Sequence, residues 1–168
     1  NGLDRRYGAG QLNVRNSYWI LAGGEQGSTE DGNAAASVAS RGFDYDPYFG
    51  GSSGSNTTAT YPLPVDTAPR LLTAALVWNL DINGGTASSF NPAATLRDLN
   101  VEVIDMGEAG SPVVAASQST VENTENVWLV VCAGSQHALR VGRAGACRRD
   151  YALRWQARFG LTSRMVVD

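Results

Sequence analysis

The sequence predicts a mainly β protein, an antiparallel β-sandwich preceded by one helix. Only one segment, near the start of the chain, has the apolar spacing of a helix. Several later segments show either the period-two alternation or the short apolar runs that are typical of strands. Turn-forming stretches separate these segments, and the chain has 19 glycines in 168 residues. Short strands joined by turns are typical of a sandwich.

Composition excludes several classes of protein. The length suits about one domain, and 43% hydrophobic against 17% charged residues, with a mean hydropathy of -0.19, indicates a globular chain. All 13 basic residues are arginines, yet the net charge is -3, which leaves no basic surplus for a nucleic acid. No apolar run is long enough for a membrane span. Because Asn1 does not begin a signal peptide, we expect a mature piece or a fragment.

The helix is expected over residues 9–21. Its apolar stripe includes Leu12 and Ile20, and the pair Gly23 and Gly24 would end it. The polar, glycine-containing run at 26–37 then reads as a loop or linker. Strands follow from that point to the end of the chain.

The first strands are expected at 42–46, 71–80 and 99–105. Residues 48–58, rich in glycine and serine, separate the first two and should be the most mobile stretch. The 71–80 run is almost continuously apolar and favours a buried strand, although periodicity alone leaves a helix open. The alternation over 99–105 indicates a strand with one face on the core.

Four further strands complete the predicted sandwich. Residues 113–120 give a weak signal, whereas 127–131 read as a short buried strand. The segment 137–141 is expected to pair back on 127–131 as a hairpin. The clearest alternation spans 151–158, with apolar side chains on one face and polar ones on the other.

Cys132 and Cys147 lie on either side of the predicted 137–141 strand. Seven or so extended residues would separate them by roughly 20 Å, far beyond the Cα spacing of about 7 Å that a disulfide permits. Two unpaired thiols are therefore favoured, and a disulfide would mean that the hairpin register is wrong. Two cysteines and one histidine do not supply a zinc site.

Asp105, His137 and Ser163 occur in the chain order of a subtilisin-type triad, and the residues around Ser163 superficially match its nucleophile segment. A nucleophilic serine requires a base within hydrogen-bond reach and an oxyanion hole. Ser163 instead follows the last strand, five residues from the end of the sequence. We expect no catalytic residue in this chain.

Two acidic clusters could bind calcium, which prefers several oxygen ligands. Asp44 and Asp46 would share one strand face, where ordinary solvation is the commoner outcome. A second oxygen-rich cluster precedes the 127–131 strand and could equally cap a turn; it comprises Glu122, Asn123, Glu125 and Asn126. No cofactor is certain, and Ca²⁺ is the one the sequence suggests.

Aromatic residues divide into two groups. Three tryptophans in apolar strands are expected in the core rather than on a sugar-stacking platform; they are Trp78, Trp128 and Trp155. Three aromatics beside the glycine-serine loop are better candidates for exposed contacts; they are Tyr45, Tyr48 and Phe49.

The opening of the chain resembles the closing segment of a subtilisin-like serine peptidase catalytic domain. There, a G-x-G-x-[LV]-[ND] motif introduces the last helix, as YGAGQLN does at residues 7–13. The later segments LLTAALVWNLDI, LRDLNVEVID, STVENTENVWLVV and DYALRWQARF resemble, in the same order, strands of the jelly-roll domain that follows the catalytic domain in some secreted subtilases. Asn100 stands where relatives often carry a second acid, which weakens any calcium site carried over from them.

This resemblance implies three segments: the end of a catalytic domain (1–25), a linker (26–40) and a β-sandwich (41–168). The chain would be a non-catalytic accessory domain of a secreted or cell-surface peptidase, with the triad upstream of Asn1. It would stabilise the catalytic domain of the same precursor or contact substrate. The helix would provide the contact surface through Tyr18, Trp19, Ile20 and Leu21.

A second interpretation is a free-standing carbohydrate-binding or adhesion module on the same sandwich. It predicts saccharide binding near Tyr45 and Phe49, whereas the accessory-domain interpretation predicts none. The sequence around the glycine-serine loop at 48–58 is compatible with both interpretations.

Overall fold

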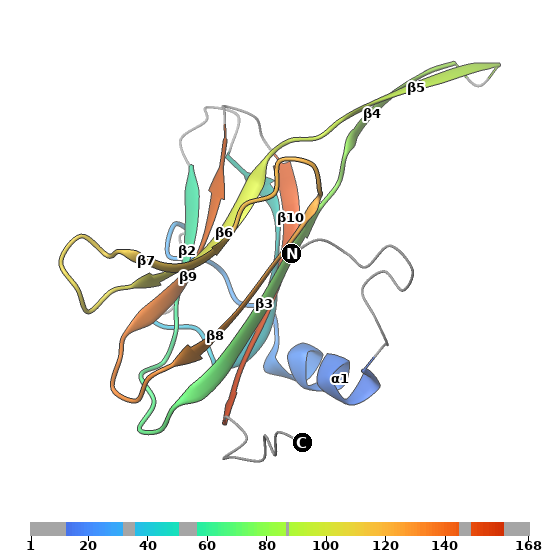
Figure 1. Ribbon diagram of the computed structural model, residues 1–168. Helices are drawn as coiled ribbons and strands as arrows, with labels where there is room; N and C mark the ends of the chain where they lie inside the picture. Colours follow the sequence, from blue (N-terminus) through green and yellow to red (C-terminus); the bar gives the residue numbers. More distant parts are fainter. Residues whose placement is uncertain (1–12, 32–35, 51–56, 87, 145–148, 160–168) are drawn as a thin grey trace, which may run out of the picture.

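The computed structural model describes residues 13–31, 36–50, 57–86, 88–144 and 149–159, which form a sandwich with one helix (Figure 1). The elements in chain order are α1 (Val14–Gly23), β1 (Arg41–Phe49), β2 (Thr58–Pro62), β3 (Arg70–Trp78), β4 (Asp81–Thr86), β5 (Ser89–Thr95), β6 (Leu99–Asp105), β7 (Val113–Ser117), β8 (Thr124–Val131), β9 (His137–Arg143) and β10 (Arg149–Phe159).

Two four-stranded antiparallel sheets, ordered β1-β10-β3-β8 and β2-β9-β6-β7, make up the sandwich. The hairpin of β4 and β5 is inserted between β3 and β6 and projects from one end (Figure 1). Apart from β6 to β7, each connection between sandwich strands carries the chain from one sheet to the other. This is the arrangement of a jelly roll, and it confirms the predicted antiparallel sandwich with one helix before it.

The core lies between the sheets, where alternate side chains of each strand meet. On β10 the inward residues Tyr151, Leu153 and Trp155 are at most 1% exposed. On β6 the inward residues Leu99, Val101 and Val103 are fully buried. Both strands show the period-two pattern that the sequence predicts, because each has one face on the core. The strands expected at 42–46 and 99–105 are confirmed within β1 and β6, and the strand expected at 71–80 is confirmed as β3, which ends two residues earlier at Trp78.

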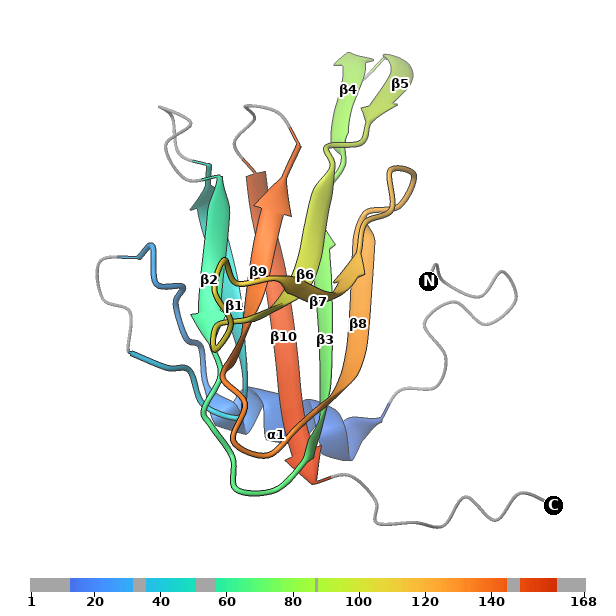
Figure 2. The same cartoon turned by 60° about the vertical axis from the view of Figure 1, so that its left-hand side comes forward.

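The helix lies against the outer face of the β1-β10-β3-β8 sheet, at one end of its strands (Figure 2). It begins after Asn13, whose side-chain oxygen accepts a hydrogen bond from the Asn16 amide at 3.0 Å. It ends at Gly24, whose φ of 79° lies in the left-handed region that favours glycine. The predicted glycine stop is confirmed, while residues 9–12 of the expected helix lie outside the described residues.

The segment expected as a linker is packed on the sandwich where the structure describes it. Val38 is 4% exposed and joins the core, and its amide donates to the Pro62 carbonyl at 2.8 Å. The Thr29 amide donates to the Thr60 carbonyl, also at 2.8 Å. No helix in the described part of the chain is long and apolar enough to cross a membrane.

The expected hairpin between 127–131 and 137–141 is wrong. β8 pairs with β3, whereas β9 pairs with β2 and β6 in the opposite sheet. The connection after Val131 therefore crosses between sheets, because both strands bury apolar faces that meet across the core instead of along one sheet. Cys132 in this connection is exposed and free, and Cys147 lies outside the described residues.

Two predictions about aromatic side chains are also wrong. Trp128 is 61% exposed on the outer face of β8, since Val127 and Leu129 take the inward positions of that strand. Phe49, expected to be exposed, is 1% exposed and packs edge-on against Tyr151, with ring centroids 5.1 Å apart. A register shift between Asp46 and Phe49 turns the Phe49 ring inward. Trp78 and Trp155 do lie in the core.

Candidate functional site

The helix presents an apolar stripe that the sandwich does not cover. Val14, Tyr18 and Leu21 follow the spacing of one helix face and are 68%, 61% and 66% exposed. No described residue of α1 is fully buried. Of the four expected contact residues, Tyr18 and Leu21 belong to this outward stripe. Trp19 and Ile20 are less exposed.

The C-terminal end of the helix and the residues that follow it are held to β1 by hydrogen bonds. The Phe43 amide donates to the Gly24 carbonyl at 3.1 Å, and the Gln26 amide donates to the Phe43 carbonyl at 2.9 Å. The Gln26 side chain also donates to the carbonyls of Gly23 and Arg41, at 3.1 Å each. A side chain at Gly23 would clash with the Arg41 carbonyl, so this close approach requires glycine. The position of α1 is therefore fixed.

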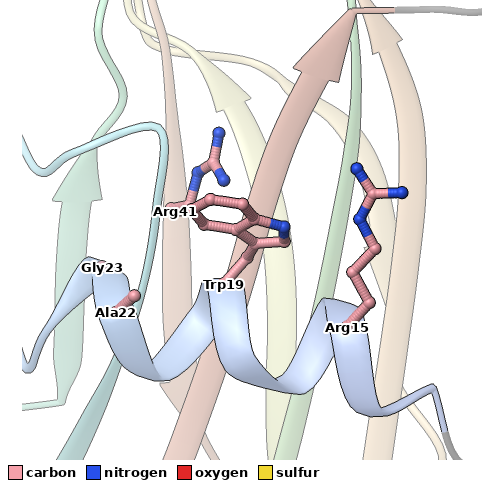
Figure 3. Close-up of a pocket in the computed structure, with 5 residues that line it drawn as sticks. All are labelled: Arg15, Trp19, Ala22, Gly23 and Arg41. Atoms are coloured by element: carbon pink, nitrogen blue, oxygen red, sulfur yellow. The ribbon is translucent and has the colours of Figure 1, made fainter.

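An open cleft of about 500 Å³ lies between the helix and the sheet, lined by Arg15, Trp19, Ala22, Gly23 and Arg41. The Arg41 guanidinium lies over the Trp19 ring, 5.1 Å from its centroid. Figure 3 shows the guanidinium groups of Arg15 and Arg41 on either side of Trp19, both directed away from the helix over the strands behind. The cleft thus combines two cationic groups with one aromatic ring.

Asp44 lies inside the sandwich and not on a solvated calcium-binding face. It is 5% exposed and accepts a hydrogen bond from the Tyr61 hydroxyl at 2.5 Å. The Tyr61 and Tyr151 hydroxyls also bond to each other. Burial raises the pKa of Asp44 to about 6, and it raises the pKa of both tyrosines as well. At neutral pH the sandwich therefore holds a buried carboxylate whose charged form is less favourable than that of an exposed aspartate.

The second oxygen-rich cluster caps the connection between β7 and β8. Glu125 is 1% exposed and accepts hydrogen bonds from the Ser117 hydroxyl and, at 2.5 Å, from the Ser119 amide. The Asn123 side chain donates to the Trp78 carbonyl at 2.8 Å. Among the described residues, no group of three histidine, cysteine, aspartate or glutamate side chains is placed to hold a metal ion. Calcium binding stays a prediction of the sequence.

Asp105 and His137 are opposite each other in the register of β6 and β9. The Asp105 carboxylate accepts instead from the Gly107 amide, at 2.8 Å, and His137 is 7% exposed. Ser163 lies outside the described residues. The two described members of the rejected triad are thus neighbours in the sheet, with His137 buried and Asp105 partly exposed.

Two solved structures show a distant likeness to this chain. No protein-family model and no curated protein matches the sequence. The pre-peptidase C-terminal domain of a collagenase from Bacillus anthracis aligns over 74% of this chain and 100% of its own, with a TM-score of 0.47 and 11% identity. The Yersinia pseudotuberculosis-derived mitogen aligns over 65% of this chain and 91% of its own, with a TM-score of 0.28 and 9% identity. Likenesses this distant bear on neither family nor activity.

Proposed function

We propose that this chain is a non-catalytic accessory domain of a secreted subtilisin-like serine peptidase, docked on the catalytic domain through α1. The observation that carries the proposal is the outward stripe of Val14, Tyr18 and Leu21 on a helix that is otherwise fixed to the sandwich. Exposed apolar stripes of this kind mark interaction surfaces. Residues 7–13 resemble the closing segment of a subtilase catalytic domain, and this resemblance indicates such a catalytic domain as the partner.

The docked helix would link the stability of the two domains. A surface that binds only the folded catalytic domain raises its apparent stability by mass action. Because the partner would be attached through the same chain, the effective concentration at the interface is high without any further contact. The role is mechanical, and the peptidase triad would lie upstream of Asn1.

The test begins with the coding sequence upstream of Asn1. An open reading frame with the aspartate, histidine and G-T-S-x-A serine motifs is expected, and a signal peptide directly before Asn1 would overturn the proposal. In the full-length peptidase, Tyr18→Ala should then lower the stability of the catalytic domain by about 1–3 kcal/mol, the contribution of one large apolar side chain buried on docking. Thermal inactivation of peptidase activity measures this.

A matched control separates docking from general surface effects. Val121 is 83% exposed and lies in the connection between β7 and β8, whereas α1 packs on β1 and β10. Val121→Ala should leave thermal inactivation unchanged within about 0.5 kcal/mol. Equal inactivation of the Tyr18→Ala and Val121→Ala proteins would contradict a docking role for the helix.

A further inference from the structure

The outer face of the β1-β10-β3-β8 sheet gathers arginines from distant parts of the chain. The sheet register places Arg41, Gln156, Thr73 and Trp128 in one row across all four strands. Arg154 and Arg158 lie two residues to either side of Gln156 on β10, and they point to the same face. Arg15 reaches over this end of the sheet from the helix (Figure 3). We call this surface the basic face; it comprises Arg15, Arg41, Arg154, Arg158 and Trp128.

The arginines of the basic face lack acidic partners. Within the described residues, ion pairs are formed by Arg70, Arg97 and Arg140, and Arg15, Arg154 and Arg158 form none. In the part of the sheet that forms the basic face, no acidic side chain of β10 or β3 points outward. Asp150 lies at the far end of β10, where it accepts from Tyr45 and Asn79, and Glu25 lies at the β1 edge opposite Phe43.

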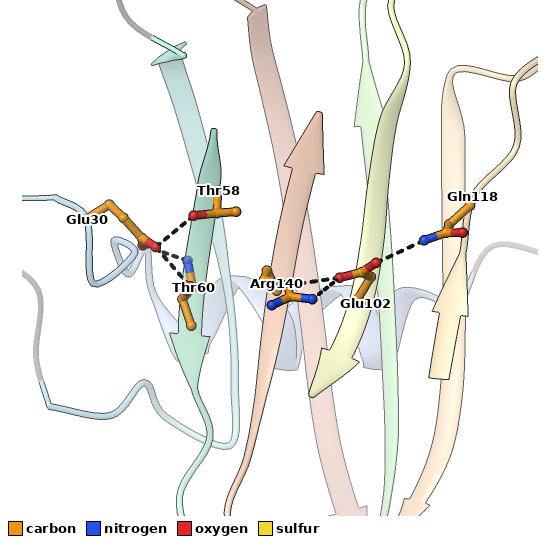
Figure 4. Close-up of polar contacts among 6 residues, drawn as sticks. All are labelled: Glu30, Thr58, Thr60, Glu102, Gln118 and Arg140. Carbon is orange, nitrogen blue, oxygen red and sulfur yellow. Dashed lines mark hydrogen bonds and ion pairs between the residues drawn. The ribbon is translucent and has the colours of Figure 1, made fainter. Parts of the chain in front are cut away.

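The opposite sheet shows the contrast. On its outer face Glu102 accepts two hydrogen bonds from the Arg140 guanidinium, at 2.9 and 2.6 Å, and one from Gln118 at 2.9 Å (Figure 4). Glu30 accepts from the Thr60 amide and hydroxyl on the same face. Among the described residues, the Arg140 guanidinium on this side is therefore ion-paired, whereas those of Arg15, Arg154 and Arg158 on the other side are not. In a chain of net charge -3, this asymmetry is local and does not follow from a general basic excess.

The crowding of these cations affects the pKa of one of them. Partial burial and the neighbouring Arg158 both lower the pKa of the Arg154 guanidinium, which remains charged at neutral pH. Like charges held together without a counter-ion repel each other, so an anion on this face would relieve the repulsion. The charge pattern predicts an anionic ligand.

The size of the face argues against a globular protein as the ligand. Three strand spacings make it about 14 Å wide, and the distance from Arg154 to Arg158 adds about 13 Å along the strands. A stable protein interface needs about 800 Å² on each side. A peptide strand cannot add to β10 or β3, because both are already paired on each edge. Over these two central strands, recognition must use side chains, and the small area suits a narrow ligand.

Trp128 adds a second requirement to the ligand. Its side chain is 61% exposed at the β8 end of the row, while Trp19 lies with Arg41 at the β1 end. An exposed indole offers a flat apolar surface on which the C–H face of a sugar ring can stack, and guanidinium forks bind carboxylate or sulfate groups. An anionic polysaccharide presents both sugar rings and acidic groups along one chain.

We propose that the basic face binds an anionic polysaccharide, with sugar rings stacked on Trp128 and acidic groups paired with Arg154 and Arg158. This function goes beyond the accessory role and does not depend on it, because it uses a surface separate from the outward stripe of α1. It also differs from the saccharide site expected near Tyr45 and Phe49, since Phe49 is buried.

Isothermal titration of the 168-residue chain with four polymers tests this proposal. Polygalacturonate carries carboxylates, dextran sulfate carries sulfates, dextran is neutral, and poly-L-glutamate is an acidic polypeptide. Binding to either of the first two, weakened by added salt, is expected, and comparison of the two identifies the acidic group. Absence of binding to both, equal binding to dextran, or equal binding to poly-L-glutamate would each overturn the proposal.

Two variants and two controls locate the site. Arg158→Gln should weaken binding about fivefold, the upper range for an exposed ion pair, and Trp128→Ala about tenfold, as for an aromatic side chain that carries much of the contact. Arg97→Gln removes the same charge from the ion pair with Asp81, and Val121→Ala removes an exposed apolar side chain elsewhere. Both controls should change affinity less than twofold. A loss as large in Arg97→Gln as in Arg158→Gln would show a delocalised charge effect and refute the site.

Discussion

Asp44→Asn should make the sandwich more stable at neutral pH and flatten the dependence of its stability on pH. In the folded protein, burial raises the pKa of Asp44 from 3.8 to about 6. The hydrogen bond from Tyr61 opposes this rise, while the nearby carboxylates of Asp31 and Asp46 reinforce it. Asparagine keeps an oxygen that can accept the Tyr61 hydrogen bond and removes the buried charge.

The sign follows from proton binding. Between pH 4 and 6 the folded state holds the Asp44 proton while the unfolded state releases it, so the free energy of unfolding falls as pH rises. A shift of about two pKa units corresponds to at most about 3 kcal/mol, reached above pH 6. Wild type and Asp44→Asn should have similar stability near pH 4, and the variant should be more stable by up to about 3 kcal/mol at pH 8.

Urea unfolding at several pH values between 4 and 8 measures the difference. Glu108→Gln is a suitable control, because Glu108 is an exposed acid in the turn between β6 and β7. The control should follow the wild-type curve within about 0.5 kcal/mol. A variant at Asp44 that keeps the wild-type slope between pH 4 and 6, or that is less stable at pH 8, would refute the reasoning.

Two further predictions concern the attachment of the helix and the 26–31 segment. Gly23→Ala should destabilise the protein by about 1–3 kcal/mol, because a Cβ would clash with the Arg41 backbone and push α1 from the sheet; an unchanged melting temperature would contradict this packing. Burial alone would raise the pKa of Glu30, but hydrogen bonds, chiefly from Thr60, outweigh it and lower that pKa. Glu30→Gln should therefore cost about 1 kcal/mol at pH 7, and this cost should disappear as pH falls below 4 in acid unfolding curves, whereas a pH-independent cost would contradict the charged hydrogen bonds.

The strands were predictable wherever one face alone meets the core. Residues 99–105 and 151–157 alternate because the outer face is solvated, so the period of two is visible in the sequence. The run VWLVV at 127–131 is apolar on both faces, so it lacks the alternation that would distinguish inward from outward residues. The sequence therefore could not show that Val127 faces inward and Trp128 outward. Its pairing with β3 was hidden for a different reason, since the partner lies about fifty residues away and the local turn favoured a hairpin.

The basic face could not be found from the sequence because its members come from four separate elements. Arg15 belongs to the helix, Arg41 to β1, and Arg154 and Arg158 to β10. In a chain of net charge -3, no local run of basic residues marks them. Only the register of β1, β10, β3 and β8 brings them to one surface with Trp128.

Helix geometry explains how α1 can serve two surfaces without conflict. Residues four apart lie on one face, so Val14 and Tyr18 form the outward stripe while Arg15 and Trp19 line the cleft over the sheet. A partner that covers the stripe approaches from the side away from the strands. The basic face would then remain open beside the docked domain, and a polysaccharide held there would keep an attached catalytic domain close to the polymer matrix.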